Sequence, residues 1–236
     1  MPRTLVVIPT YNEKDNLPLI LKEIDDLKVK NLTVLVVDDN SPDGTGSLAD
    51  NLRSKFLNLF VLHRRKKEGL GKAYIDGFKY ALKKFDFNYL LQMDADFSHD
   101  PQDIKRIIKT LSDYDVVIGS RHIEGAELRY PLFRKALSSC ANLYARTIFL
   151  LPVHDCTSGF KGYRREVIEE IIQERYYSNA YAFQNEILFY IKRHGFTIKE
   201  IPVVFEDRVR GKSKMNAYNI FDGFWGMLKL RFREFK

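Results

Sequence analysis

The sequence predicts an α/β fold, a mostly parallel, Rossmann-like sheet with helices on both faces. Short β-branched runs alternate with segments of helical apolar spacing through the first half of the chain. Each run is apolar at consecutive positions, as expected of a strand that is covered on both sides. Polar clusters follow four of these runs, and ligands of such sheets bind beyond the carboxyl ends of the strands. The same pattern therefore predicts the fold class and the place of its binding site.

The first half divides into strands and helices in a regular order. Residues 5–8 form a short apolar run ended by Pro9, and residues 34–37 form a second run closed by a dense turn signal at 38–44. Pro101 lies near the first turn of a later helix, a position that proline favours. The other expected strands are 59–62, 89–93 and 116–118, and the expected helices are 13–27, 48–56, 72–84 and 101–111.

The second half is expected to be mainly helical. No repeat and no linker rich in Pro, Gly or Ser divides it from the first half, so residues 1–236 are expected to form one domain. The expected elements are helices at 133–151, 164–173 and 184–193, a strand at 198–205, and a final helix at 217–236.

The final helix at 217–236 is expected to be amphipathic. Phe221, Phe224, Trp225 and Leu228 recur at helical spacing, and charged residues occupy the other side. Core packing is the usual role of such a stripe. A membrane interface explains a terminal, basic helix bearing Trp and Phe equally well.

Composition and charge narrow the function classes. The chain has 236 residues, of which 45% are apolar and 29% are charged, which is ordinary for a globular protein and excludes wholesale disorder. The net charge is +7, and residues 208–236 alone carry eight basic and two acidic side chains. This local excess indicates a local anionic partner and argues against general nucleic-acid binding.

Cysteine usage and hydropathy predict where the protein works. The two cysteines, Cys140 and Cys156, have neither disulfide-framework nor zinc spacing, so a reducing compartment is expected. The N-terminus has no long apolar run behind a basic one, so no signal peptide is expected, and no run of about 18 uncharged apolar residues is present. We therefore expect a cytoplasmic protein. An interfacial role of the basic helix at 217–236 would associate it peripherally with the cytoplasmic face of a membrane.

The acidic pair Asp94 and Asp96 is the strongest local signal. It follows the apolar run at 89–93. Two carboxylates at a strand end are typical of a site for a hard cation such as Mg²⁺ or Mn²⁺, which takes carboxylate, water and substrate phosphate oxygens. A surface turn with two solvated Asp side chains is the alternative. The parallel-sheet context favours the metal site, because phosphate ligands bind at that edge.

A second acidic pair, Asp38 and Asp39, follows the second run. Its carboxylates can accept hydrogen bonds from ribose hydroxyls or a base N–H, and turn formation is the alternative role of Asp38 and of nearby Asp43. Tyr11 and Glu13 follow the first run, where Tyr11 could stack on a base and Glu13 could accept from it. Helix capping explains that segment equally well.

Two basic loops and one candidate anion site complete the polar signals. The loop at 63–67 precedes Gly-Leu-Gly-Lys at 69–72, but Lys66 stands where a Walker A loop needs glycine. We therefore interpret 63–67 as a solvated basic loop that enters a helix. The loop at 208–214 suits a phosphate clamp that closes over substrate. Arg121, Arg134 and Ser138 form a candidate anion site, because arginine binds phosphate with two donors. Solvated surface charge is the alternative for both.

Several motifs of this chain occur together in one known family. They are Ile-Pro-Thr-Tyr-Asn-Glu at 8–13, Val-Asp-Asp-Asn-Ser-Pro-Asp-Gly-Thr at 37–45, Gly-Leu-Gly at 69–71, Met-Asp-Ala-Asp at 93–96, Gly-Ser-Arg at 119–121, Ser-Gly-Phe at 158–160, Tyr-Arg at 163–164, Asp-Arg at 207–208 and Gly-Lys-Ser-Lys at 211–214. The chain resembles the family 2 glycosyltransferases of the GT-A fold, and among them the polyprenol (dolichol) phosphate mannosyltransferases. The resemblance spans nearly the whole chain.

The resemblance implies a GDP-mannose donor and assigns residues to it. The residues expected to hold guanosine are Pro9, Tyr11, Glu13, Val37 and Asp39. The residues expected to hold the diphosphate and the metal are Asp94, Ala95 and Asp96, with Gln184 near the nucleotide and with Arg208 and Lys214 closing over the donor. Some relatives place a metal-facing Gln where this chain has Ser98, whose hydroxyl can still reach a metal or its water.

The resemblance also implies the acceptor, a polyprenyl or dolichyl phosphate at a membrane surface. Arg121, Arg134 and Ser138 are expected to meet its phosphate, and Asp96, Arg121 and Arg134 are the expected catalytic residues. Relatives of the short type without a membrane-spanning region can depend on separate small membrane subunits. No nucleic-acid partner is expected.

The implied chemistry agrees with the residues. A phosphate monoester has a second pKa of about 6, so the acceptor is already anionic at neutral pH and needs no strong general base. A divalent cation would offset the diphosphate charge, and Arg and Lys would offset the acceptor phosphate. A related transferase that uses UDP-glucose or a hydroxyl acceptor is the first alternative. A non-catalytic module that binds anionic membranes is the second, although it leaves the acidic clusters unexplained.

Overall fold

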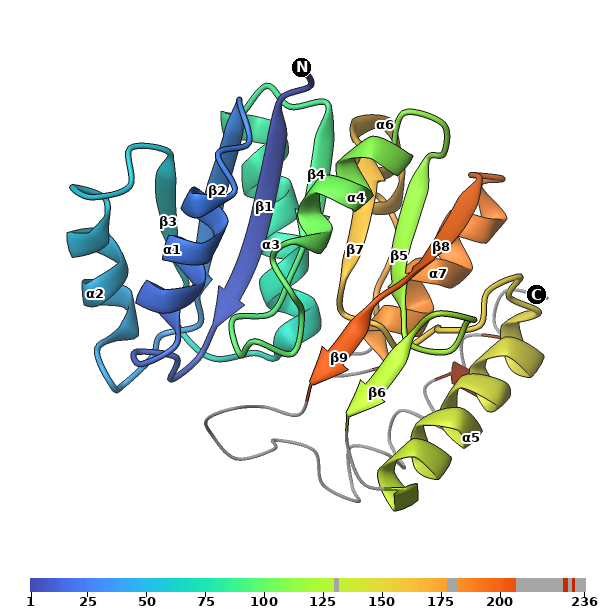
Figure 1. Cartoon of the computed structure of the whole chain (residues 1–236). Helices are drawn as coiled ribbons and strands as arrows, with labels where there is room; N and C mark the ends of the chain where they lie inside the picture. The colour runs from blue at the N-terminus through green and yellow to red at the C-terminus, as the bar shows by residue number, and fades with distance from the viewer. Residues whose placement is uncertain (130–131, 178–181, 207–226, 229–230, 232–236) are drawn as a thin grey trace.

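Seven strands form one sheet with helices on both faces (Figure 1). The structure is a computed structural model that describes residues 1–129, 132–177, 182–206, 227–228 and 231. The strand order is β3-β2-β1-β4-β7-β5-β8, and all strands run parallel except β7. The expected mostly parallel α/β fold is confirmed. The strands are β1 (Thr4–Thr10), β2 (Leu32–Asp38), β3 (Leu59–His63), β4 (Tyr89–Gln92), β5 (Val116–Ser120), β7 (Lys161–Arg164) and β8 (Ile198–Pro202).

Strand β1 shows why consecutive apolar residues predict a central strand. Val6 and Ile8 point into one apolar layer, whereas Leu5 and Val7 point into the other. All four side chains are at most 1% exposed. Burial of each such side chain stabilises the fold by about 1.5–3 kcal/mol, so the strand contributes to both layers at once.

The helices divide between these two layers. Helices α1, α2 and α4 pack on one face, and α3, α5, α6 and α7 contribute to the layer on the other. Figure 1 shows α5 below the main group of helices, beside the lower edge of the sheet. The helices are α1 (Leu17–Asp26), α2 (Thr45–Leu52), α3 (Leu70–Lys84), α4 (Asp103–Thr110), α5 (Leu132–Phe149), α6 (Arg165–Ile171) and α7 (Phe183–Arg193).

Two features of the sheet depart from the sequence expectation. Strand β7 is inserted antiparallel between β4 and β5, where no strand was expected. Gly162 makes this possible, because a Cβ there would overlap Ile107 of α4. The strand expected at 198–205 is interrupted at Val203, after which β9 (Val204–Glu206) pairs with β6 (Glu127–Arg129) in a small second sheet.

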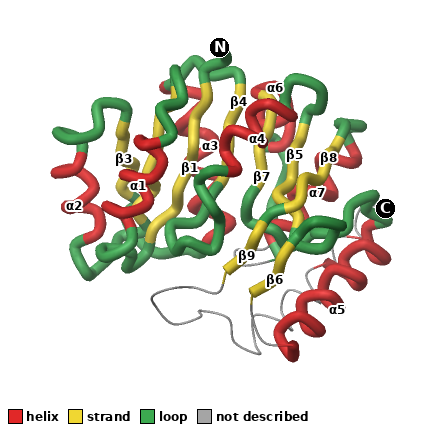
Figure 2. The backbone as a smooth tube through the Cα atoms, in the orientation of Figure 1, coloured by secondary structure: helices red, strands yellow, loops and turns green. Residues whose placement is uncertain are grey.

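Loops gather at the lower edge of the sheet, where the parallel strands end (Figure 2). Within the described ranges, no helix is long and apolar enough to cross a membrane. Of the helix expected at 217–236, only 227–228 and 231 are described, and the rest lies outside the described residues. Met227 is buried and belongs to the apolar layer that contains α3 and α7.

Candidate active site

The segments after β1 and β2 meet at the lower edge, as their polar residues predicted. Thr10 Oγ1 donates to Asp38 Oδ1 at 3.3 Å, and the Asn12 N–H donates to Ser41 Oγ at 3.1 Å. The Asp39 N–H donates to the Thr10 carbonyl at 2.9 Å. These contacts place the start of the 11–16 segment directly against the turn that follows β2.

The turn after β2 is built by the side chains of Asp38 and Asp43. Asp38 accepts from Ser41 Oγ at 2.6 Å and from the Ser41 N–H at 3.2 Å. Asp43 accepts from Thr45 Oγ1 at 2.6 Å and from the Thr45 N–H at 2.9 Å, which lowers the pKa of Asp43 against the opposing effect of burial. Turn formation is therefore what these two carboxylates do here. Asp39 takes no part in these turn bonds, and its role toward a nucleoside stays a prediction.

Asp39 pairs with Arg64, and this corrects the interpretation of the 63–67 loop. The Arg64 side chain is only 5% exposed and donates to Asp39 Oδ1 through Nη1. Its Nε donates to Asp76 Oδ2 at 2.8 Å, and its Nη2 to Glu68 Oε2 at 3.2 Å. Burial raises the pKa of Asp39, and the Arg64 charge opposes that shift. Residues 65–67 are exposed and form a loop, whereas His63 ends β3.

Arg64→Met is expected to lower the free energy of unfolding by about 3 kcal/mol, because it leaves a buried carboxylate at Asp39 without its cation. Urea unfolding followed by circular dichroism measures this. Arg65→Met is the matched control, since Arg65 is the next residue and is exposed. A change within about 0.5 kcal/mol is expected there. Equal losses in the two variants would contradict a special role for Arg64.

The other residues expected to hold guanosine lie around the same turn. Tyr11 is partly exposed, and the Lys67 ammonium lies 3.7 Å from its ring centroid, a cation–π contact on a ring face expected to stack on the base. The Glu13 carboxylate accepts from Asn16 Nδ2 at 2.8 Å. Pro9 and Val37 are buried neighbours in β1 and β2, and the Val37 side chain belongs to the apolar layer.

The acidic pair after β4 lies at the predicted edge. Asp96 is 4% exposed and accepts from the Ser98 N–H at 3.1 Å and from Ser98 Oγ at 2.6 Å. Asp94 is partly exposed, and its Oδ1 accepts from Tyr74 Oη at 3.0 Å. Ala95 between them is buried. The Ser98 hydroxyl therefore turns toward Asp96, and its role as a metal ligand stays a prediction.

His99 supports this loop and was not singled out from the sequence. Its Nδ1 accepts the Asp94 N–H at 3.2 Å, and its ring stacks on Phe160 with centroids 5.0 Å apart. Burial lowers the pKa of His99, which favours the neutral ring that can accept this bond. Gly159 lies against the pair, because a Cβ there would approach Asp94 Oδ2 to 3.0 Å. The side chains that surround the loop thus come from distant segments.

Asp94 and Asp96 fit a divalent cation that also binds a substrate phosphate. No group of three or more His, Cys, Asp or Glu side chains in the described part of the chain could by itself enclose a metal. Mg²⁺ is commonly bound through one or two carboxylates together with water and substrate phosphates. The donor set at this strand end, two carboxylates two residues apart, meets that requirement. Bound there, a cation would neutralise phosphate charge.

Gln184, expected near the nucleotide, lies in a buried polar group behind this loop. Its Oε1 accepts from Gln92 Nε2 at 2.9 Å and from Lys161 Nζ at 2.7 Å. Gln92 Nε2 also donates to the Gly159 carbonyl at 2.9 Å. Burial lowers the pKa of Lys161 to about 7. Gln184 thus supports the 158–160 segment, which touches Asp94, from within.

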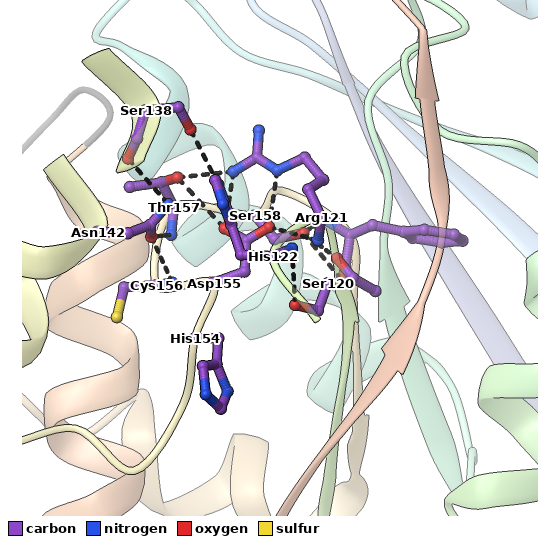
Figure 3. A network of polar contacts seen from close by, with 12 residues as sticks. Ser120, Arg121, His122, Ser138, Asn142, His154, Asp155, Cys156, Thr157 and Ser158 are labelled. Carbon is purple, nitrogen blue, oxygen red and sulfur yellow. Dashed lines mark hydrogen bonds and ion pairs between the residues drawn. The ribbon is translucent and has the colours of Figure 1, made fainter. Parts of the chain in front are cut away.

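Arg121, at the end of β5, is held by a buried carboxylate. Its Nε and Nη2 donate to the two oxygens of Asp155, each at 2.7 Å, and Nη2 also donates to Thr157 Oγ1 at 2.6 Å (Figure 3). Despite burial, the Arg121 charge lowers the pKa of Asp155 to about 2. The pair is therefore neutral as a whole. Net positive charge for an anion must therefore come from other residues.

Two other residues expected to bind the acceptor phosphate come from α5. Ser138 lies 3.1 Å from His122, measured from Oγ to Nε2 (Figure 3). His122 follows Arg121 directly, so the structure brings Ser138 and Arg121 to one locality. Arg134 belongs to the first turns of α5, but its side chain lies outside the described residues, as do Arg208 and Lys214.

Phe205 connects the acidic loop with Arg121. Its ring centroid lies 6.0 Å from that of His99 and 5.0 Å from Arg121 Cζ. His99 and Phe205 also form an isolated bridge between their backbones. One aromatic ring therefore contacts both the support of the carboxylate pair and the guanidinium. The acidic and basic parts of the site lie close together.

The sequence of this chain matches a known family. The sequence profile described as Glycosyl transferase family 2 matches residues 5–172. The chain belongs to glycosyl transferase family 2. Polyprenol monophosphomannose synthase of Mycolicibacterium smegmatis is 41% identical over 233 residues, which cover 95% of this chain and 87% of that protein. Undecaprenyl-phosphate mannosyltransferase of Micrococcus luteus is 41% identical over 216 residues, which cover 91% of this chain and 88% of that protein.

Solved structures of other enzymes share the fold of this glycosyltransferase. Glucosyl-3-phosphoglycerate synthase from Mycobacterium tuberculosis, in complex with Mn²⁺, UDP and glucosyl-3-phosphoglycerate, superposes with a TM-score of 0.68 at 18% identity, covering 98% of this chain and 80% of that chain. A mannosyltransferase from Pyrobaculum calidifontis, in complex with GDP-Man and Mn²⁺, superposes with a TM-score of 0.62 at 19% identity. The match covers 98% of this chain and 64% of that chain. Identity at this level shows the GT-A fold alone.

Proposed function

We propose that this family 2 transferase moves mannose from GDP-mannose to a polyprenyl phosphate, giving polyprenyl-phosphate mannose with inversion at the sugar carbon. The geometry that carries the proposal is the closeness of the Asp94–Asp96 pair to Arg121. Phe205 contacts Arg121 and also His99, and His99 binds the backbone of Asp94. A carboxylate pair suits a metal-bound diphosphate, and oriented guanidinium donors suit a phosphate acceptor. The names of the two relatives support the same reaction.

The reaction balances without an added base. An anionic oxygen of the acceptor phosphate attacks the sugar C1, the bond from C1 to the GDP oxygen breaks, and its electron pair leaves with GDP. Mg²⁺ or Mn²⁺, held by Asp94 and Asp96, would supply charge neutralisation for the departing diphosphate. Arg121 and Ser138 would orient the attacking phosphate. His99 is buried and accepts from the Asp94 backbone, so its role is to support the loop.

The donor contacts follow from the turn after β2. Asp39 would accept from the nucleoside while Arg64 holds its carboxylate, and Tyr11 would offer a ring face once Lys67 moves aside. The acceptor carries a long apolar chain, so the protein would work at a membrane face. The basic segment 208–236 would add attraction for that surface.

A donor and acceptor panel tests the proposal. Purified protein with Mg²⁺ or Mn²⁺ is expected to form lipid-linked mannose from GDP-mannose and a polyprenyl phosphate, and chelation of the metal is expected to abolish this. The anomeric configuration of the product, read by NMR, is expected to be inverted. Transfer from UDP-glucose in place of GDP-mannose would contradict the donor. Transfer only to alcohols would contradict the acceptor.

A further inference from the structure

His122 and Ser138 form a polar pair that the reaction described above leaves without a role for the imidazole. Nε2 of His122 lies 3.1 Å from Ser138 Oγ, and both side chains are half-buried (Figure 3). His122 comes from the segment after β5, whereas Ser138 comes from α5. The pair therefore joins the segment that contains Arg121 to the helix that contains Ser138.

A ring of hydrogen bonds fixes the distance between these two segments. Arg121 Nη2 donates to Thr157 Oγ1, and the Thr157 N–H donates to Asn142 Oδ1 at 3.2 Å. Asn142 Nδ2 donates to the Ser138 carbonyl at 3.1 Å, and His122 closes the ring through the Ser138 hydroxyl. Asn142 is 3% exposed. A buried amide that is bonded on both sides leaves this ring little freedom.

The Ser138 hydroxyl has one hydrogen to donate and two lone pairs that accept. If Ser138 donated to His122, its hydrogen would be unavailable to an anion. We propose that His122 is a positioning residue for the acceptor phosphate: its Nε2–H donates to Ser138 Oγ and directs the Ser138 hydrogen toward that phosphate. This inference rests on the proposed function, because it takes Ser138 as a contact of the acceptor.

The surroundings of His122 favour a neutral ring. Burial lowers the pKa of His122, and the adjacent Arg121 lowers it further, whereas Asp155 and Glu200 act in the opposite sense. A neutral imidazole carries one N–H and one lone pair, so it can donate from Nε2 without adding charge. The ring then acts on the acceptor phosphate by orienting the hydroxyl hydrogen of Ser138.

His122→Phe is expected to raise the acceptor KM about tenfold while kcat and the donor KM stay within about twofold, because one oriented hydrogen bond to a charged group is lost. Ser138→Ala is expected to have the same effect. The double variant is expected to show no further effect, since both changes remove the same oriented hydrogen bond to the acceptor phosphate. His122→Gln keeps a side-chain donor and is expected to restore most of the acceptor affinity.

Controls separate this inference from the function on which it rests. Thr147→Ala removes another hydroxyl of α5, which donates to the Leu143 carbonyl, and should leave all parameters unchanged. Binding of a short-chain isoprenyl phosphate, followed by ³¹P NMR without donor, reports the subsite independently of transfer. Additive effects of His122→Phe and Ser138→Ala, or a loss in kcat with an unchanged acceptor KM, would overturn the role of His122. If wild type bound no isoprenyl phosphate, the inference would fall together with the acceptor assignment.

Discussion

Asp96→Asn is expected to lower kcat for mannosyl transfer by about a hundredfold to a thousandfold in a protein that remains folded. The amide oxygen can still accept from the Ser98 N–H and hydroxyl, so the turn keeps its two local bonds. What the substitution removes is one negative charge from the proposed metal site. Loss of a charge that holds the cation removes its neutralisation of the leaving diphosphate, which accounts for several kcal/mol of the barrier.

Two measurements check this expectation. Steady-state kinetics at saturating Mn²⁺ give kcat, and isothermal titration calorimetry with GDP gives the affinity for Mn²⁺. Asp100→Asn is the matched control, because Asp100 is exposed four residues further on and its carboxylate accepts only a local bond from the Gln102 N–H at 2.8 Å among those described. Full activity of Asp96→Asn, or equal losses in the two variants, would refute the metal assignment.

Asp155→Asn is expected to lower the free energy of unfolding by about 3 kcal/mol. The Asp155 carboxylate is fully buried and binds Arg121, whose side chain is 12% exposed, with both of its oxygens. Removing one partner of a buried ion pair leaves the other charge uncompensated, and such losses are about 3–5 kcal/mol. Asparagine keeps the size of the side chain and one hydrogen-bond acceptor, which places the expected loss of stability at the lower end of this range.

The same pair predicts how stability depends on pH. The pKa of Asp155 is lowered in the folded protein from 3.8 to about 2, so its contribution is fully present above about pH 4 and is lost as the pH falls toward 2. The shift corresponds to about 2 kcal/mol. Urea unfolding across this pH range measures the contribution. In Asp155→Asn, the free energy of unfolding should not show the part of the acid decline that comes from Asp155.

Asp86→Asn is the control for the unfolding experiments. Asp86 pairs with Arg3 at 2.8 Å, but both side chains are more than half exposed. Such surface pairs contribute about 0–1 kcal/mol, so its loss should be small. A loss as large as that of Asp155→Asn would show that burial of the pair has no special weight.

The central sheet could be predicted because its signals are local. The apolar runs at 5–8 and 34–37 became β1 and β2, which extend one or two residues beyond each end of the predicted run. Strand β7 could not be predicted, because Lys161, Gly162, Tyr163 and Arg164 show no apolar run. Its place between β4 and β5 depends on the fit of Gly162 under α4, which is a contact across more than fifty residues.

The candidate site divides in the same way. Asp39, Asp94 and Asp96 are conspicuous because acidic residues directly follow apolar strands. The burial of Arg64 was missed, because the surrounding residues are basic and its partners Asp39 and Asp76 are distant in sequence. Asp155 is likewise 34 residues from Arg121. Sequence pattern thus finds charges at strand ends, whereas their pairing emerges only from the fold.

The segment from Asp155 to Gly159 touches both halves of the proposed reaction. Asp155 holds Arg121 on the acceptor side, and Gly159 lies against Asp94 on the donor side. Ser158 between them donates to the Gly119 carbonyl at 2.7 Å. On the proposed function, the two substrates would share one border made of a few consecutive residues. An alteration there would then be expected to affect the choice of sugar and the choice of lipid together.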